Sequence, residues 1–444
     1  MKNRFKLGLS ALALAFLAGC GGGSSEENGQ IIYYTVTPSV SGSGGGKISP
    51  AAPVSVRPGA ATSFTLIPDS GYAVSGVGGT CGGTLGGTTY KTNAITADCT
   101  VEAAFVSTDS GSTPGRYQAS FDAASQWASA QSLPSGAIMY TTSTINPYFA
   151  NLAATGMLKD PKRHGQVQKW MQWYIGHLNW PDKWGLYGTT YDYDIVRGQE
   201  ISTNNADSTD SYAATFLSLA YNYYIAGDRT AQAYVQGLSS QLDTIGGVIV
   251  ATMQPDGLTW ATPDYQIKYL MDNCEVFRGL DDLAKLYAAM GDTARARKYS
   301  DYAARNKNGI LGMWMGSYWG VYKDWNGRNI APDMTAWYPD ASAQIFPVLY
   351  QVVPGSDWRA QTAYENLNQA WPGWPQLNFM RQDAFPWAMV AGGAAQMGDT
   401  RRVDQYISSI EARYVNQGFP WTWDVAENGW FMRVLNYENG ARPF

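Results

Sequence analysis

Apolar positions recur with helical spacing through most of the chain beyond residue 116. Clear examples are residues 212–220, 280–290 and 385–397. Each run leads to a Gly-Asp pair, at positions 227–228, 291–292 and 398–399. Glycine suits the end of one helix, and aspartate suits the cap of the next. The pattern therefore predicts hairpins made of an apolar inner helix, a tight turn and a more polar outer helix.

An acidic residue opens or enters each apolar segment at a nearly fixed distance before the following turn. The acid and turn residues are Asp210 and Asp228, Asp272 and Asp292, Asp340 and Asp357, and Asp383 and Asp399. If each segment is one helix, its acid lies roughly 24–30 Å from the turn. Parallel helices stacked in this way would gather carboxylates at one end. We therefore expect an acidic cleft there.

The spacing of the turns indicates how many hairpins are present. Asp228 and Asp292 are 64 residues apart, and the 107 residues from Asp292 to Asp399 hold two units. Five to seven hairpins of this size fit into residues 116–444, and six would close into a ring. A tetratricopeptide array has similar turns, but its repeat period of about 34 residues is shorter than this spacing. We expect residues 116–444 to be an all-α toroid.

Residues 31–107 follow a different pattern. Short alternating runs, such as residues 63–67 and 101–106, are broken by Gly, Pro, Asn and Asp. This is typical of a small all-β module. Polar, glycine-rich stretches at residues 21–30 and 108–115 indicate a flexible tether before the module and a linker after it.

Residues 1–20 have the features of a secretion signal. Basic residues at positions 2, 4 and 6 precede an apolar stretch, residues 7–17, that is too short to span a bilayer. Leu17-Ala18-Gly19-Cys20 resembles the lipobox of bacterial lipoproteins, which implies cleavage before Cys20 and diacylation of its thiol. A plain signal peptide and a buried apolar helix are the alternatives. Because Gly21 is not the Asp that marks inner-membrane retention, we expect an outer-membrane lipoprotein, periplasmic or at the cell surface.

Cysteine and histidine are rare in the chain. Cys81 and Cys99 lie 18 residues apart in an exported segment, which predicts a disulfide between them. Cys274 lies in an apolar run, where we expect a small buried side chain. The two histidines, His164 and His177, show no metal-binding spacing. We therefore expect neither a metal nor a cofactor, and a Ser-His-Asp triad is poorly supported.

Composition narrows the range of partners. With 444 residues the chain can hold two or three domains, and 45% hydrophobic with 15% charged residues is a globular composition. The net charge of −5 and the pI near 5.2 argue against a nucleic-acid partner, which would favour a basic face. We expect a monomer attached to the membrane through Cys20.

Two known families are similar to parts of the chain. Residues 31–107 resemble the glycine-rich β-repeat domains of bacterial surface proteins, in segments such as GGGKISP and ITADCTVEAAF. The module would then be a spacer or bind carbohydrate. Residues 117–442 resemble the six-hairpin glycosidases, in their repeats and in segments such as DSTDSYAATFLSLAY. That resemblance implies an (α/α)6 barrel with a cleft at one end, a polysaccharide or oligosaccharide substrate, and hydrolysis that usually inverts.

Glycoside hydrolysis needs two carboxyl groups flanking the bond, one protonated and one ionised. Asp207 and Asp210 lie at the start of an apolar run, and we predict Asp210 as the general base or a water-orienting group, supported by Asp207. Asp272 and Glu275 share a helix face among apolar residues, which would raise their pKa values as a general acid requires. The alternatives are a helix cap for the first pair and an ion pair between Glu275 and Arg278 for the second.

Further acidic and aromatic residues on the predicted loops would hold the sugar. Carboxylates accept hydrogen bonds from hydroxyl groups, and tryptophan and tyrosine present a flat apolar face to a pyranose ring. The predicted substrate-binding residues are Asp192, Asp194, Asp256, Trp260, Tyr265, Trp337, Tyr338, Asp340 and Asp383.

These observations predict an exported, lipid-anchored glycoside hydrolase that cleaves its substrate with a pair of carboxylates. A polysaccharide lyase on the same toroid is a second hypothesis, in which His177, Tyr191 and Arg197 would matter instead. A non-catalytic glycan-binding or scaffold lipoprotein is the third, because helical repeats and a lipid anchor suffice for it.

Overall fold

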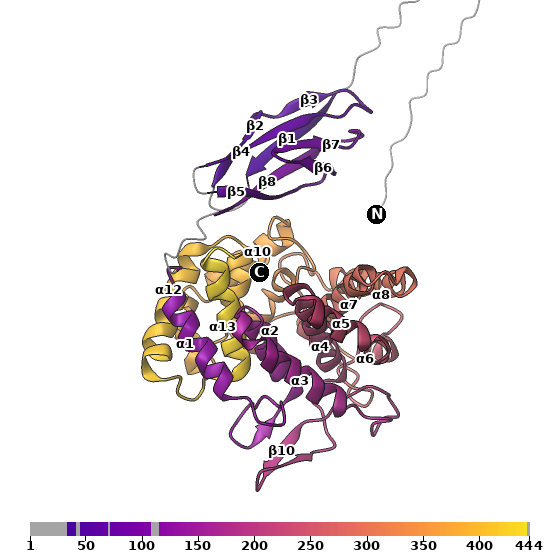
Figure 1. The fold of residues 1–444 in the computed structure, drawn as a ribbon, viewed down its shortest axis with the longest axis vertical. Coiled ribbons are helices and arrows are strands. Elements are labelled where there is room, and N and C mark those ends of the chain that lie inside the picture. The colour runs from indigo at the N-terminus through magenta and orange to yellow at the C-terminus, as the bar shows by residue number, and fades with distance from the viewer. Residues whose placement is uncertain (1–32, 41–44, 70–71, 108–114, 442–444) are drawn as a thin grey trace, which may run out of the picture. The chain divides into compact units, whose positions relative to one another are not determined.

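The computed structural model describes residues 33–40, 45–69, 72–107 and 115–441 (Figure 1). The chain forms two compact units, divided between Ser110 and Gly111. The predicted signal segment with Cys20, the tether at residues 21–30 and most of the predicted linker lie outside the described residues. Among the described residues, no helix is both long enough and apolar enough to cross a bilayer.

The N-terminal unit is built from β-strands, as its alternating pattern predicts. The strands are β1 (Tyr34–Val40), β2 (Gly46–Ser49), β3 (Val54–Val56), β4 (Ser63–Pro68), β5 (Tyr72–Gly78), β6 (Gly83–Gly86), β7 (Thr89–Thr92) and β8 (Cys99–Ser107). They form two sheets, with the orders β3-β1-β8-β5 and β2-β4-β7-β6. In β4, Phe64 and Leu66 are buried and alternate with exposed neighbours, so one face of the strand packs into the core.

The predicted disulfide between Cys81 and Cys99 is present, with the two Cα atoms 5.0 Å apart. It ties the segment before β6 to the first residue of β8. Closing a loop of this length stabilises a fold by about 3 kcal/mol.

The second unit, residues 115–441, is mostly helical. Its α-helices are α1 (Gln118–Ala130), α2 (Pro147–Met157), α3 (His164–Gly176), α4 (Thr209–Ala226), α5 (Arg229–Gly237), α6 (Ser239–Thr252), α7 (Leu270–Ala289), α8 (Thr293–Leu311), α9 (Phe346–Leu349), α10 (Trp358–Ala370), α11 (Ala388–Gln396), α12 (Thr400–Arg413) and α13 (Val425–Glu438). Short helical turns are η1 (Pro161–Arg163), η2 (Trp337–Ala341), η3 (Trp374–Gln376), η4 (Asn378–Arg381) and η5 (Val415–Gln417). Two small sheets lie in the loops, formed by β9 (Thr144–Ile145), β10 (Tyr193–Val196) and β11 (Gln199–Ser202), and by β12 (Lys268–Tyr269), β13 (Tyr322–Lys323) and β14 (Asn329–Ile330).

The Gly-Asp turns end one helix and begin the next, as predicted. Gly291 and Gly398 have left-handed backbone, with φ of +81° and +76°, directly after the C-caps of α7 and α11. The side chains of Asp228, Asp292 and Asp399 accept hydrogen bonds from backbone N–H groups in the first turns of α5, α8 and α12.

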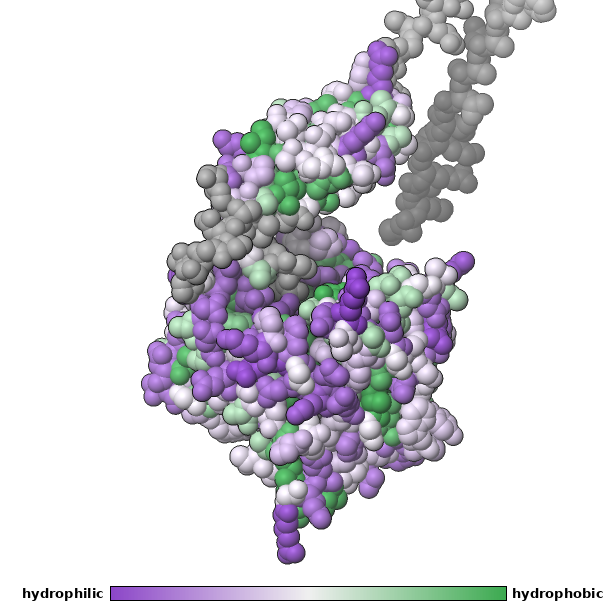
Figure 2. All heavy atoms as spheres, viewed as in Figure 1, coloured by the Kyte–Doolittle hydropathy of each residue, from purple (hydrophilic) through white to green (hydrophobic). Residues whose placement is uncertain are grey.

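Six helices of the described part contact one another in a closed order. Helix α2 packs against α4, α4 against α7, α7 against α9, α9 against α11, α11 against α13, and α13 against α2. We call these the ring helices. Others pack outside them, such as α8 on α7 and α12 on α11. On the face seen in Figure 2, hydrophilic side chains cover much of the surface over α1 and α12.

Glycine allows the ring helices to approach one another closely. A Cβ atom on Gly279 of α7 would lie 2.5 Å from the carbonyl oxygen of Ala214 in α4. One on Gly156 of α2 would lie 2.3 Å from the carbonyl oxygen of Gly429 in α13. These helix pairs are therefore in backbone contact, which larger residues would prevent.

Two predicted inner helices differ from the expectation. The run from Asp340 to Asp357 is not one helix, because it holds a π-helical turn, η2, and the four-residue α9. Pro347 lacks the N–H that a helix running into α9 would need. The run predicted over residues 385–397 becomes helical only at Ala388. Pro386 disfavours helical backbone in the residue before it, and Trp387 is left-handed with φ of +56°.

Candidate active site

A cavity of about 370 Å³ lies at the N-terminal ends of the ring helices. Each ring helix contributes a lining residue from its first two turns or from just before them. The cavity falls within the size range of small-molecule sites, about 300–1,000 Å³. Its lining residues are Tyr140, Asn146, Tyr148, Phe149, Asp207, Ser208, Ser211, Tyr212, Met271, Asp272, Glu275, Tyr338, Phe346, Asp383, Phe385, Trp387, Met389, Asp424, Ala426, Glu427 and Trp430.

Carboxyl groups are concentrated in this cavity. The acidic lining residues are Asp207, Asp272, Glu275, Asp383, Asp424 and Glu427. Such a group of like charges is costly to ionise fully, but each helix N-terminus stabilises a nearby anion by about 0.3–1 kcal/mol. The converging ends of the ring helices therefore offset part of the repulsion.

One acidic side of the cavity comes from α4 and α7. Oε1 of Glu275 accepts hydrogen bonds from the phenol groups of Tyr148, at 2.6 Å, and Tyr350, at 3.0 Å. Burial raises the pKa of Glu275 to about 7, although these hydrogen bonds oppose the change. Burial, followed by the charges of Asp210 and Glu275, also raises the pKa of Asp272 well above its usual range.

The other acidic side comes from α13 and the segment before α11. Oε1 of Glu427 accepts the N–H of Trp387 at 3.0 Å, and Oε2 accepts that of Ala388 at 2.6 Å. Burial, followed by the charge of Asp424, raises the pKa of Glu427 to about 8. Asp424 caps α13 through the N–H groups of Ala426 and Glu427, and burial raises its pKa to about 6. The left-handed backbone at Trp387 thus begins a helix whose first N–H groups hold Glu427 in place.

The order in which the ring helices contact one another around the ring determines which sides of the cavity face each other. Helices α4 and α7 are neighbours, and so are α11 and α13. In a closed ring of six, α4 lies across from α11, and α7 lies across from α13. The side with Asp207 and Glu275 therefore faces the side with Asp383 and Glu427, with the cavity between them.

The structure places Asp210 differently from the prediction. Asp210 is fully buried and does not line the cavity. Its Oδ1 accepts hydrogen bonds from Ser208 Oγ and Ser211 N, and its Oδ2 accepts one from Thr259 Oγ1. Asp210 therefore fixes the start of α4 against the segment before β12, while the exposed Asp207 faces the cavity. These positions do not support the predicted roles, in which Asp210 acts on the substrate or water and Asp207 only supports it.

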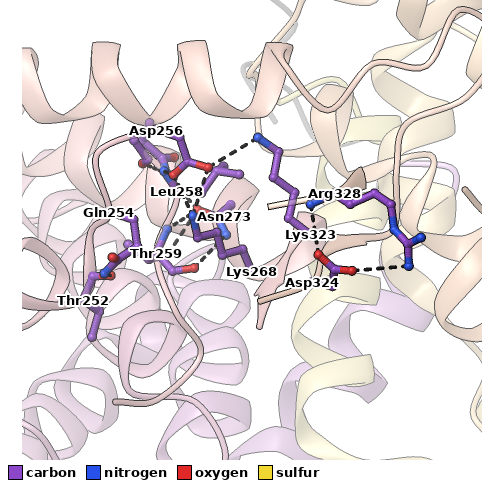
Figure 3. A network of polar contacts seen from close by, with 12 residues as sticks. Thr252, Gln254, Asp256, Leu258, Thr259, Lys268, Asn273, Lys323, Asp324 and Arg328 are labelled. Atoms are coloured by element: carbon purple, nitrogen blue, oxygen red, sulfur yellow. Dashed lines mark hydrogen bonds and ion pairs between the residues drawn. The ribbon is translucent and has the colours of Figure 1, made fainter. Parts of the chain in front are cut away.

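Asp256 belongs to a separate polar network (Figure 3). Both of its carboxylate oxygens lie 2.9 Å from Nζ of Lys268, and Oδ2 lies 3.3 Å from Nζ of Lys323. The two ammonium groups lower its pKa, although partial burial opposes this. Asp256 does not line the cavity, and its interactions tie the turn before β12 to β12 and β13.

The remaining predicted residues are divided between the cavity and other places. Tyr338 and Asp383 line it. Asp192 lies behind it, where its Oδ1 accepts a hydrogen bond from the phenol of the lining residue Tyr212, at 2.8 Å. The other predicted sugar-binding residues, which do not line the cavity, are Asp194, Trp260, Tyr265, Trp337 and Asp340. The alternative ion pair between Glu275 and Arg278 is also absent, because Arg278 pairs with Asp282 at 2.8 Å.

Sequence reasoning missed the acids of the last ring helix. Asp424 and Glu427 lie three positions apart, as in a helix-capping box, which is a signal visible in the sequence. The repeat pattern depends on a Gly-Asp turn after the inner helix, and residues 439–444, which follow α13, contain none. Within the described ranges, no group of His, Cys, Asp and Glu side chains is arranged to hold a metal ion.

Comparison with known proteins supports the fold. No protein-family model matches the chain, and no curated protein is similar to it in sequence. A GH63 mannosylglycerate hydrolase from Thermus thermophilus, solved with glucose, is similar with a TM-score of 0.52 and 12% identity, covering 70% of this chain and 98% of its own.

Two other solved structures are similar to the chain to about the same extent. An uncharacterized conserved protein, also from Thermus thermophilus, has a TM-score of 0.51 and 13% identity, over 71% of this chain and 98% of its own. A glycosidase variant in complex with glucose has a TM-score of 0.50 and 13% identity, over 72% of this chain and 96% of its own. At these identities the similarity concerns the fold, and it confirms the predicted resemblance to helical glycosidase structures at that level.

Proposed function

We propose that this chain is a glycoside hydrolase whose helical unit is an (α/α)6 toroid. The observation that carries the proposal is one cavity, at the N-termini of the ring helices, with carboxyl groups on two facing sides. Hydrolysis of a glycosidic bond needs two such groups, one to protonate the leaving oxygen and one to activate water. The similarity to helical glycosidase folds supports the same conclusion.

We assign the two catalytic roles to Glu427 and Asp207. The proton donor must hold its proton at neutral pH, and the raised pKa of the buried Glu427 meets this requirement. The backbone N–H groups of Trp387 and Ala388 orient its carboxyl group. The exposed Asp207, on the facing side, activates the water. Attack by that water on the face away from the leaving group inverts the anomeric centre.

The substrate proposed for the cavity is a glycoside of a glucose-type hexopyranose. Two structures with similar folds, the mannosylglycerate hydrolase and the glycosidase variant, were solved in complex with glucose. Neutral hydroxyl groups can donate hydrogen bonds to the many carboxylates of the cavity. Tyr140, Tyr148 and Trp387 provide aromatic faces beside them.

The cavity offers less to a lyase. A lyase must neutralise the carboxylate of a uronate, but no Lys, Arg or His from the described residues lines this cavity. Those carboxyl groups of the cavity that are ionised would repel an anionic sugar.

The experiment is incubation with a panel of α- and β-linked gluco- and manno-oligosaccharides, and with uronate polymers as a lyase control. We expect new reducing ends without absorbance near 235 nm, and their loss in Asp207→Asn and Glu427→Gln. Unsaturated products would favour the lyase. Retention of a glycan without cleavage would favour a binding protein.

The cellular location is a separate part of the proposal. We propose that Cys20 is lipidated and that the protein is an outer-membrane lipoprotein, with the β unit as a spacer, working as a monomer. The motif at residues 17–20 supports this. Labelling of cells with an alkyne analogue of palmitate should mark the wild-type protein and leave Cys20→Ser unmarked.

A further inference from the structure

Trp421 is an exposed tryptophan beside the cavity. It lies in the segment between η5 and α13, and 63% of its surface is accessible. Its ring meets those of Tyr140 and Phe385 edge-on, with centroids 6.4 and 5.8 Å away. Both of these residues line the cavity, so Trp421 stands at its rim.

Tyr338 occupies a matching position. It lines the cavity and is also 57% exposed, which places it at the mouth. Its ring lies 5.2 Å from that of Trp387. Phe385 and Trp387 are two residues apart, so Trp421 and Tyr338 border the same short segment before α11. Two pairs of aromatic rings therefore lie along this segment, and each pair joins a residue that lines the cavity to an exposed ring.

The segment that carries Trp421 is held in place. The hydroxyl of Thr422 donates a hydrogen bond to the carbonyl oxygen of Ala384. The next residues, Trp423 and Asp424, are buried, and Asp424 caps α13. The indole of Trp421 is therefore exposed on an anchored segment beside the cavity, where it offers a flat apolar face with one N–H donor.

We propose that Trp421 and Tyr338 form a second sugar subsite, which binds the leaving-group sugar by stacking and selects substrates of at least two sugar units. This rests on the proposed hydrolase function. The cavity of about 370 Å³ takes the sugar whose bond is cleaved. The next sugar must then lie at the mouth, where the exposed rings offer flat apolar faces to it.

Other exposed tryptophans serve as comparisons. Trp325 is 78% exposed and does not line the cavity. Trp358 is 59% exposed and packs against Trp314, which does not line the cavity either. Neither residue makes a ring contact with a lining residue among those described, so Trp325→Ala is a matched control for loss of a surface indole.

The experiment compares a short and a long substrate. The short one is the glycosyl fluoride of the sugar that the wild type cleaves, whose leaving group is a single atom, and the long one is the corresponding tetrasaccharide. In Trp421→Ala we expect kcat/KM for the tetrasaccharide to fall about ten-fold, the size of one aromatic stacking contact, mainly through KM. The glycosyl fluoride should change less than two-fold. An equal fall for both substrates, or the same effect in Trp325→Ala, would overturn the subsite.

A binding measurement separates this proposal from the hydrolase function. Calorimetric titration of gluco- and manno-tetraose is carried out in the Glu427→Gln background, with and without Trp421→Ala. Weaker binding on loss of Trp421 supports the subsite even where the wild type cleaves none of the sugars, which would reject only hydrolysis. Equal binding with and without Trp421, or no binding of any tetrasaccharide to Glu427→Gln, would reject the subsite.

Discussion

Replacement of Glu427 by Gln probes the acidic side of the cavity that faces Asp207. The change removes a buried carboxyl group beside Asp424 and keeps nearly the same volume. The amide can still accept one of the two N–H groups, from Trp387 or Ala388, but its NH2 group cannot accept the other. Leaving one buried donor unsatisfied costs about 1–3 kcal/mol.

Glu427→Gln should also remove a loss of stability that the wild type suffers as pH rises. In the folded state the pKa of Glu427 is raised from 4.5 to about 8, so the folded protein holds a proton that the unfolded chain releases. Wild-type stability therefore falls as pH rises from about 4.5 to 8, by at most about 5 kcal/mol for this group. Because Asp424 titrates in the same site, we expect roughly half of that, ~2 kcal/mol. Glu427→Gln lacks this loss.

Urea unfolding at pH 5 and pH 8 measures the difference. All 17 tryptophans follow residue 115, so tryptophan fluorescence reports on the helical unit alone. We expect the variant to be less stable than the wild type at pH 5 and to recover most of the deficit, or exceed the wild type, at pH 8. A stability difference that stays the same at the two pH values would refute the protonated state assigned to Glu427.

Two further predictions concern the residues around the site. Asp210→Asn should lower the free energy of unfolding by about 1–3 kcal/mol, because Ser208, Ser211 and Thr259 lose a hydrogen-bond acceptor. Its kcat should stay within about three-fold of the wild type. Loss of turnover at unchanged stability would show instead that Asp210 takes part in catalysis. Gly279→Ala should cost about 2 kcal/mol or more in urea unfolding, because its Cβ would meet the carbonyl of Ala214 at 2.5 Å. Gly247→Ala in α6 is its control, because nothing lies within 4 Å of the added Cβ and helix propensity favours Ala by up to about 1 kcal/mol; equal effects of the two changes would contradict the close contact of α4 and α7.

Much of the fold could be predicted from local patterns. Gly-Asp turns and alternating strands depend on neighbouring residues, and Asp228, Asp292 and Asp399 act as the predicted caps. Apolar spacing alone predicts continuous helices around Pro347 and Pro386, and the prolines interrupt them.

The site was harder to predict because it depends on contacts between distant segments. Asp207 and Asp210 are similar in sequence context, and only the partners Thr259 and Ser211 show which of them is turned away from the cavity. Glu427 is positioned by backbone N–H groups 39 and 40 residues away, at Ala388 and Trp387. No local pattern carries that information.

The most direct test of the account is chemical rescue of the two catalytic variants. Asp207→Ala should lose turnover by about 100-fold or more, and azide should restore it with a glycosyl azide as product, because the small anion replaces the activated water. Glu427→Gln should remain active on a glycosyl fluoride, whose leaving group needs no proton. If azide rescues Glu427→Ala and not Asp207→Ala, then Glu427 activates the water and Asp207 donates the proton. Full activity of Asp207→Ala without azide would contradict the claim that facing carboxyl groups carry out hydrolysis in this cavity.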